Sequence, residues 1–299
     1  MTMLQNLRRV LRRRRPTELV VLDVEPDGNF HYRDLASRCR TQNEFNRLHI
    51  GLENVLSPLE LATIAKLAVT PGFPEPSRLW LEKIQGWTPQ LFEAPQRYKR
   101  RSFSRHVSLY QDPERDVRDK SLLVAFSGNS RRLGMPIPVF LQYVDSNLWD
   151  VVVLKKCARN SYLLGVEGIA SDFFGLVDYV GATVSAAHYR RVMTFGPSGG
   201  GFAAAWAAAL MGANRGISVC GGVPNPPPSL ASEDERPPRG VDLCFVFGAD
   251  NARDHQSALA LMGLFGGRLR PIPGIPNHGV LGRLMKRGQL GEFLDEMLA

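Results

Sequence analysis

The stretch from Arg190 to Leu210, RRVMTFGPSGGGFAAAWAAAL, restricts the possible folds more than any other part of the sequence. Residues 191–195 are β-branched and aromatic and predict a buried strand, whereas 202–210 are rich in alanine and predict a helix. Only a few small residues separate the two elements, so the chain must pass from strand to helix in one tight turn. Such a turn is typical of an α/β fold, whose sites lie where the strands end.

The turn itself, Gly196-Pro197-Ser198-Gly199-Gly200, fits the pattern G-x-S-x-G. The absence of side chains at Gly196 and Gly200 lets the flanking backbones pass closely, and the tight turn is expected to hold Ser198 in a strained conformation. The serine hydroxyl would then stand above the sheet at the start of a helix. There the N–H of Gly199 is placed to stabilise a developing oxyanion. The pattern therefore predicts Ser198 as a nucleophile.

The same glycines fit two other patterns less well. Residues 199–204 match the dinucleotide fingerprint G-x-G-x-x-A, but the next predicted strand, 216–219, is not followed by the acidic residue that would hold a ribose. A phosphate-binding loop needs a lysine and a serine or threonine after the glycines, where this chain has Phe202 and Ala203. A strand–helix turn without chemistry is the simpler alternative. The nucleophile interpretation therefore needs partners further along the chain.

Length and composition are those of one large domain with an extension. The chain has 299 residues, of which 44% are hydrophobic, and it contains no run of eighteen or more apolar residues that would predict a membrane span. Its four cysteines lie far apart and match no metal-ligand spacing, so neither a metal nor another cofactor is expected. Cys220 and Cys244 fall in predicted strands, where reduced, buried thiols are expected. These features predict a cytoplasmic protein.

Arginines cluster near the N-terminus, at positions 8, 9 and 12–15, and contribute to the net charge of +8. A weak apolar stripe accompanies them, so a weak contact with an anionic membrane is one expectation, and a solvated, frayed end is the alternative. The remaining charges are scattered without interleaved aromatic residues, so nucleic-acid binding is not expected. The sequence predicts no particular oligomeric state.

Residues 1–100 predict a mainly helical extension with a basic terminus, and no catalytic constellation stands out in it. Ser57-Pro58 is a favourable helix start, because a serine N-cap precedes a proline at the first helical position. The polar stretch 98–120 is interpreted as a linker. A second domain is then expected over 121–299.

From residue 121 onward, apolar strand-like runs alternate with helical patterns. The strands are predicted at 122–126, 150–154, 191–195, 216–219, 241–247 and 269–272. Helices are expected between them and at the C-terminus. Strands that alternate with helices indicate a mostly parallel sheet with its sites at the C-terminal ends of the strands.

Partners for Ser198 follow the last two predicted strands. Asp250 and Asp254 come after the first of these strands, and His278 lies in a loop rich in glycine and proline after the second. A histidine there would take the serine proton as general base and return it to the leaving group, while the acid holds the imidazole tautomer. Asp254 is preferred over Asp250, because its longer loop can curl back over the strand ends, but Asp254 could equally be the N-cap of the next helix.

The order serine, acid, histidine resembles that of the α/β-hydrolase superfamily. The resemblance covers about 121–299 and is carried by LLVAFSGN, TFGPSGGG, VFGADNARD and IPNHG in register. It implies a mostly parallel sheet of the α/β-hydrolase type. It also implies a second oxyanion donor, Gly128 or Asn129, beside Gly199, in the loop after the first of these strands (the oxyanion loop, residues 127–132). This chain lacks the HG dipeptide that is common at that place in the superfamily.

These features predict a serine-dependent ester or thioester hydrolase, or an acyltransferase, that forms an acyl-enzyme on Ser198. Arg131 and Arg132 in the oxyanion loop could receive an anionic or polyhydroxyl part of a small-molecule or glycan ester. The cations after the neighbouring strand, Lys155, Lys156 and Arg159, could do the same. Solvated loop charges are the simpler interpretation of these cations. The alternative function is a non-catalytic interaction module of the same fold, whose working parts are the basic terminus and the helical extension.

Overall fold

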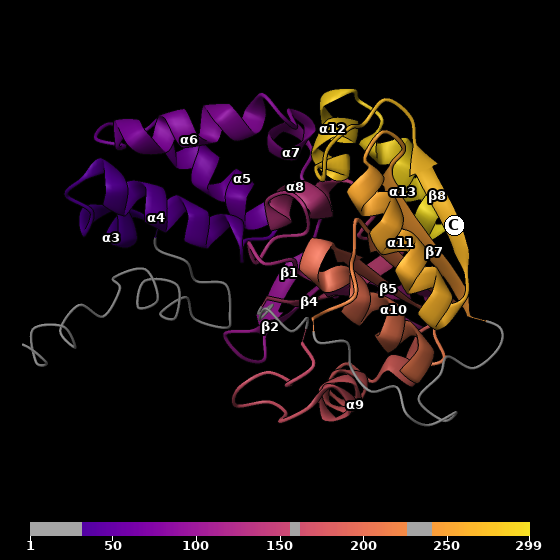
Figure 1. Ribbon diagram of the computed structural model, residues 1–299. Coiled ribbons are helices and arrows are strands. Elements are labelled where there is room, and N and C mark those ends of the chain that lie inside the picture. The colour runs from indigo at the N-terminus through magenta and orange to yellow at the C-terminus, as the bar shows by residue number, and fades with distance from the viewer. Residues whose placement is uncertain (1–31, 156–161, 226–240) are drawn as a thin grey trace, which may run out of the picture.

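The computed structural model describes residues 32–155, 162–225 and 241–299, which form a large sheet with helices on both faces (Figure 1). The basic terminus lies outside these ranges, so its expected contact with an anionic membrane stays a prediction. Within the described ranges, no helix is both long enough and apolar enough to cross a membrane.

The strands of the sheet are β1 (Lys99–Ser102), β2 (Val107–Gln111), β3 (Ser121–Phe126), β4 (Trp149–Leu154), β5 (Arg191–Pro197), β6 (Arg215–Val219), β7 (Asp242–Gly248) and β8 (Arg268–Ile272). Their order across the sheet is β1-β2-β4-β3-β5-β6-β7-β8. Strand β2 is antiparallel to its two neighbours, and each of the other neighbouring pairs is parallel. The predicted fold class is confirmed: a mostly parallel sheet of the α/β-hydrolase type, with a mainly helical region before it.

The stretch 98–120, predicted as a linker, belongs to the sheet, so this prediction is wrong. It contains β1, β2 and a short 3-10 helix at Val117–Asp119. Strand β1 has the sequence KRRS, and its buried side chain is Arg100, which lies 2.9 Å from Glu60 of helix α5 (Pro58–Leu67). A charged edge strand has no apolar alternation, so its sequence pattern indicates no strand.

The helices before the sheet are α3 (Tyr32–Ser37), α4 (Gln42–Glu53), α5, α6 (Glu75–Gln85) and α7 (Gln90–Glu93). Helix α5 begins after Ser57, whose hydroxyl accepts the N–H of Glu60, so the predicted helix start is confirmed. Leu52 and Leu61 belong to the same cluster of buried residues as Leu123 of β3. The N-terminal helices therefore share one hydrophobic core with the sheet.

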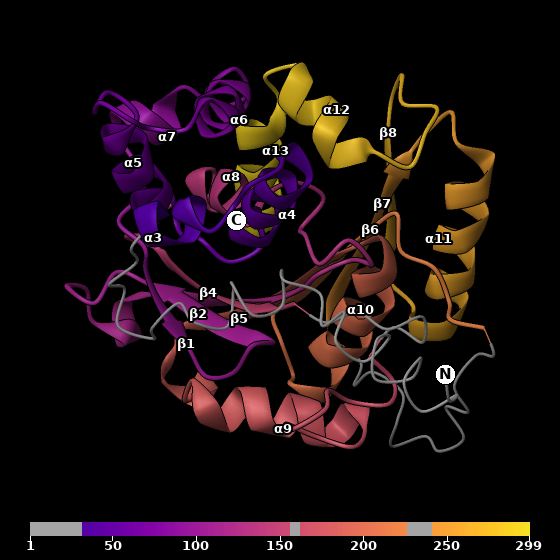
Figure 2. The same cartoon turned by 90° about the vertical axis from the view of Figure 1, so that its left-hand side faces the viewer.

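Helices cover both faces of the sheet (Figure 2). The face that carries the N-terminal helices is also covered by α8 (Ile137–Gln142), α12 (Val280–Lys286) and α13 (Leu290–Leu298). The opposite face is covered by α9 (Phe173–Thr183), α10 (Gly201–Leu210) and α11 (Ala252–Phe265), which form a second core. Because β3 to β8 all run in the same direction, their carboxyl ends meet at one edge of the sheet, where the sites of such folds form.

Two glycine substitutions test the close packing at the end of β5. A Cβ at Gly196 would lie 2.1 Å from the carbonyl oxygen of Gly200, whereas a Cβ at Gly181 of α9 would meet nothing within 4 Å. We expect Gly196→Ala to lower the free energy of unfolding by about 1–3 kcal/mol or more. Gly181→Ala should raise it by about 0.5–1 kcal/mol, because alanine loses less backbone entropy in a helix. Urea unfolding measures both, and a Gly196→Ala protein as stable as wild type would contradict this packing.

Candidate active site

Strand β5 and helix α10 are joined by a single 3-10 turn, Ser198–Gly200. Ser198 has a φ of +53°, in the left-handed region that few residues other than glycine adopt. The Cβ that Gly200 lacks would lie 2.1 Å from the carbonyl oxygen of Phe126, and the Cβ that Gly196 lacks would meet the backbone of Gly200. Both positions require glycine, so the predicted tight turn with a strained serine is confirmed.

Three side chains from different parts of the chain form a hydrogen-bonded line: one from the 3-10 turn after β5, one from α11 and one from the loop before α12. The Nε2 of His278 lies 2.9 Å from the Oγ of Ser198, and its Nδ1 lies 2.9 and 3.1 Å from the two carboxylate oxygens of Asp254. A neutral imidazole in this position donates one N–H to the acid and offers its other nitrogen to the hydroxyl. This is the geometry that a general base needs to take a proton from a serine.

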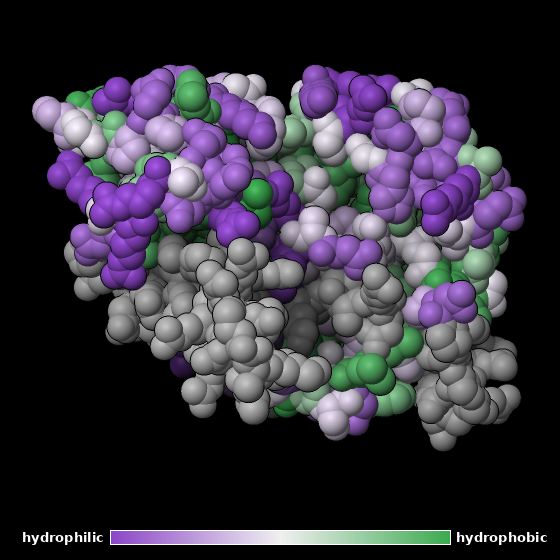
Figure 3. Space-filling model, turned by 60° about the vertical axis from the view of Figure 1, so that its left-hand side comes forward, coloured by the Kyte–Doolittle hydropathy of each residue, from purple (hydrophilic) through white to green (hydrophobic). Residues whose placement is uncertain are grey.

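The two partners of the serine differ in how far solvent can reach them. The molecular surface is hollowed between the N-terminal helices and the part of the molecule that contains α11 and α12 (Figure 3). Asp254 lies in the first turn of α11, and His278 lies just before α12. The Asp254 side chain is 6% exposed, whereas that of His278 is 54% exposed. A molecule from solvent can therefore reach the imidazole while the acid stays covered.

Asn251 explains why Asp254, and not Asp250, lies against the histidine. Asn251 is the N-cap of α11: its Oδ1 accepts the N–H of Asp254 at 3.2 Å, and its amide donates to the Asp254 carboxylate at 2.9 Å. Asp254 is therefore not the N-cap of this helix, and its carboxylate is aimed at His278. Asp250 is exposed, and in the described part of the chain no hydrogen bond joins it to the imidazole.

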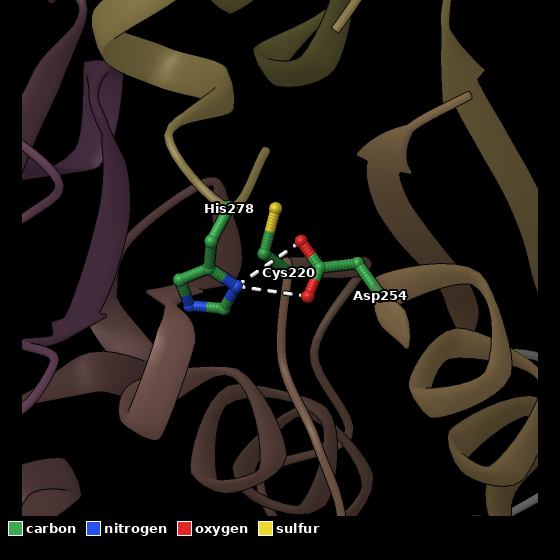
Figure 4. A group of neighbouring side chains, drawn as sticks. All are labelled: Cys220, Asp254 and His278. Atoms are coloured by element: carbon green, nitrogen blue, oxygen red, sulfur yellow. Dashed lines mark hydrogen bonds and ion pairs between the residues drawn. The ribbon is translucent and has the colours of Figure 1, made fainter. Parts of the chain in front are cut away.

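Cys220, a free cysteine directly after β6, lies beside the acid and the histidine (Figure 4). Its Sγ, a carboxylate oxygen of Asp254 and a ring nitrogen of His278 lie within 4.8 Å of one another. Burial, together with the neighbouring Asp254 carboxylate, raises the pKa of the thiol to about 12, so the thiol keeps its proton at neutral pH. A metal would require the thiolate and an unprotonated Nδ1. The group therefore fits a buried thiol beside a hydrogen-bonded acid better than a metal centre.

Sequence reasoning missed the position of Cys220 beside the acid. It predicted a buried, reduced thiol in a strand, and the residue is buried but lies just beyond the end of β6, with a φ of +52°. Its position in the chain could have indicated that it lies near the site, because the residue after a parallel strand adjacent to β5 lies at the same sheet edge as Ser198. Neither the residue type nor the cysteine spacing could identify Asp254 as its neighbour.

The oxyanion loop packs directly on the serine turn. The Cβ that Gly128 lacks would lie 3.1 Å from the carbonyl oxygen of Pro197 and 3.4 Å from the Cβ of Ser198. The N–H of Gly128 donates to the carbonyl oxygen of Arg132 at 3.0 Å, so it is already used within the loop. The prediction of Gly128 as a possible oxyanion donor is therefore wrong. Asn129, the next residue of the loop, stays a predicted donor together with Gly199 of the serine turn.

The two arginines of the oxyanion loop differ in their surroundings. Arg131 is exposed and has a φ of +60°, and its predicted contact with substrate stays a prediction. The guanidinium of Arg132 lies 2.5 Å from the carboxylate of Glu53 and donates to the side chain of Asn54. These partners occupy the end of α4, far from Arg132 in the sequence. The prediction that Arg132 receives substrate is corrected accordingly: its guanidinium binds the N-terminal helices.

Of the three cations predicted after β4, Lys156 and Arg159 lie outside the described residues. Lys155 is buried directly after the end of β4. Its ammonium donates to the hydroxyl of Ser108 in β2 at 2.8 Å. Burial, followed by the nearby positive charge of Arg100, lowers the pKa of this lysine to about 7. A side chain held inside the protein in this way cannot meet a substrate from solvent, so this prediction is also wrong.

The chain resembles known proteins in structure but not in sequence. No protein-family model and no curated protein sequence matches it. Dienelactone hydrolase from Anabaena variabilis is similar in structure, with 15% identity, a TM-score of 0.46, and coverage of 68% of this chain and 97% of that one. Est1E from Butyrivibrio proteoclasticus has 13% identity and a TM-score of 0.43, and the match covers 67% of this chain and 98% of that one. The acylaminoacyl peptidase from Pyrococcus horikoshii has 15% identity and a TM-score of 0.47, and the match covers 70% of this chain and 43% of that one.

Sequence identities this low are informative about the fold alone and not about the activity. The sheet order, the strand–turn–helix connection at the serine and the sequence of the three site residues along the chain are observations on this protein itself. Together they assign it the α/β-hydrolase fold.

The burial of Lys155 should make the free energy of unfolding depend on pH in a predictable direction. The pKa of Lys155 is about 7 in the folded protein, whereas an unfolded lysine has a pKa of about 10.4. At a pH between these two values, the lysine carries its proton in the unfolded state but not in the folded state. The free energy of unfolding of wild type should therefore rise with pH across this interval, relative to Lys155→Met. Urea unfolding near pH 7 and near pH 10 measures the difference. Lys99→Met, at an exposed position of β1, is the control and should follow wild type.

Proposed function

We propose that the chain is a serine hydrolase or acyltransferase that acts on esters or thioesters through an acyl-enzyme on Ser198. One observation carries the proposal: the imidazole of His278 lies 2.9 Å from the serine hydroxyl on one side and 2.9 Å from the buried carboxylate of Asp254 on the other. The strained backbone of Ser198 supports the same conclusion, because such strain is concentrated at functional positions.

The first half of the reaction acylates the serine. His278 Nε2 takes the hydroxyl proton while Ser198 Oγ attacks the carbonyl carbon of the ester. The carbonyl oxygen becomes negative and accepts hydrogen bonds from the backbone N–H groups of Gly199 and Asn129. When the tetrahedral intermediate collapses, the bond to the leaving alcohol or thiol breaks, and the imidazolium returns the proton to it. Asp254 stabilises the imidazolium and holds the Nδ1–H tautomer throughout.

The second half of the reaction releases the acyl group. Water, or the hydroxyl of an acceptor, loses its proton to His278 Nε2 and attacks the acyl carbon, and Ser198 recovers the proton as its bond to the acyl group breaks. Water as acceptor gives a hydrolase, and an alcohol gives an acyltransferase. The proposed substrates are esters of small molecules or of glycans, and the reaction requires no cofactor.

An activity-based fluorophosphonate probe tests the proposal directly. We expect the probe to label wild type and to leave Ser198→Ala unlabelled, because the probe captures only an activated serine. Ser130→Ala, which removes an exposed hydroxyl from the oxyanion loop, is the matched control and should be labelled like wild type. Circular dichroism establishes that each variant is folded. A folded wild type that resists the probe would favour the non-catalytic interaction module instead.

A pair of carboxylate variants tests the assignment of the acid. Asp254→Asn should keep the fold but lower kcat for an aryl ester by orders of magnitude, because the amide neither enforces the tautomer nor stabilises the imidazolium. In a serine protease the same exchange costs about 10⁴-fold. Asp250→Asn should stay close to wild type, because that side chain is exposed and unconnected to His278. The reverse pattern would transfer the role to Asp250, and two fully active variants would refute the acid–histidine–serine mechanism.

A further inference from the structure

A largely buried ion pair ties the oxyanion loop to helix α4. The guanidinium of Arg132 lies 2.5 Å from Glu53 Oε2, and its Nε donates to Asn54 Oδ1 at 3.3 Å. Glu53 is the last residue of α4 and Asn54 is its C-cap, so the cation also lies at the negative end of the helix dipole. The loop that packs on the nucleophile is therefore anchored in the N-terminal helices.

Glu53 itself is fixed from its other side. Its Oε1 accepts the indole N–H of Trp80 at 3.0 Å, and the indole ring is stacked on His49 with the ring centroids 4.4 Å apart. The Glu53 side chain is only 7% exposed, and a carboxylate so far from water is tolerated only when both of its oxygens have partners. The carboxylate therefore presents one fixed oxygen to Arg132.

The backbone of Arg132 transmits this position to the nucleophile. Its carbonyl oxygen accepts the N–H of Gly128 at 3.0 Å, and the N–H of Arg131 donates back to the carbonyl oxygen of Gly128 at 2.9 Å. Gly128 is a neighbour of the nucleophile, because a Cβ added to it would lie 3.4 Å from the Cβ of Ser198. Arg131 has a left-handed backbone, and such strain persists only where the surroundings impose it. A displacement of Arg132 would therefore move the part of the loop that faces the serine.

We propose that Glu53 and Arg132 are positioning residues for acyl transfer: they hold the oxyanion loop so that the backbone N–H of Asn129 meets the oxygen that becomes negative in the reaction. The helices before the sheet then complete the active site. The inference rests on the proposed serine chemistry. Neither side chain touches the substrate, since both act through the backbone of the loop.

A second ion pair provides a matched control. Arg100 of β1 donates to Glu60 of α5 at 2.9 Å, so it also joins an N-terminal helix to the sheet, and both of its side chains are largely buried. This pair lies at the edge strand β1, which in the sheet order is separated from β5 by β2, β4 and β3. Removal of either arginine leaves a poorly solvated carboxylate without its ion-pair partner. Only the removal of Arg132 is expected to disturb the oxyanion loop.

The experiment compares Arg132→Met with Arg100→Met in the full chain. Both variants should have a lower Tm than wild type, because each leaves a buried charge without its partner. Only Arg132→Met should lose kcat for an aryl ester, by about 10- to 100-fold with little change in KM, because the oxyanion contact strengthens in the transition state. Its affinity for a trifluoromethyl ketone, which forms an oxyanion on the serine, should fall by a similar factor.

Two further variants separate positioning from general packing. Arg132→Lys keeps a cation for Glu53 and should recover part of the lost kcat. Glu53→Gln keeps an oxygen for Trp80 but removes the charge, and should lose kcat like Arg132→Met. The double variant should lose no more than either single one, because both changes break the same link.

The inference is overturned if folded Arg132→Met keeps kcat within about twofold of wild type, or if Arg100→Met loses as much. If Arg132→Met does not fold, the same criteria apply to Glu53→Gln. The fluorophosphonate probe separates this failure from failure of the proposed function. Unlabelled wild type removes the proposed function, whereas labelled wild type with unchanged kcat in these variants removes the positioning role alone.

Discussion

The close approach of Gly196 to Gly200 is the constraint on which the rest of the site depends. Because neither residue has a side chain, β5 can turn directly into α10, and the intervening Ser198 is forced to a φ of +53°. That backbone displays the hydroxyl at the carboxyl edge of the sheet, 2.9 Å from His278. A longer connection would relieve the strain, but it would also allow the hydroxyl to move away from the imidazole.

Each partner of the serine is placed by a separate local device. The Asn251 cap aims Asp254 at the histidine, and the missing Cβ of Gly128 allows the oxyanion loop to pack on Ser198. The N-terminal helices contribute through Arg132, whose partners lie on a different element from the loop. These helices share the core of the sheet, so residues 32–120 are part of the same structural unit as the proposed catalytic residues.

Part of this arrangement could be read from the sequence because its causes are local. The glycines around Ser198 specify the turn within five residues, and strand–helix alternation specifies a parallel sheet whose carboxyl ends converge. The sequence could not decide between Asp250 and Asp254, since both follow the same strand and only the capping bond of Asn251 separates them. Strand β1 was missed because its buried residue is an arginine whose partner, Glu60, lies in a distant helix.

Short patterns of residue types were therefore sufficient to predict the fold class, the strained serine and the order of the candidate site residues along the chain. Which charged residues face solvent could be seen only in the folded protein. Lys155 and Arg132 resemble solvated loop cations in the sequence, yet one donates to Ser108 and the other pairs with Glu53. A charge can be buried only beside a partner, and these partners are far apart in the sequence and are brought together by packing.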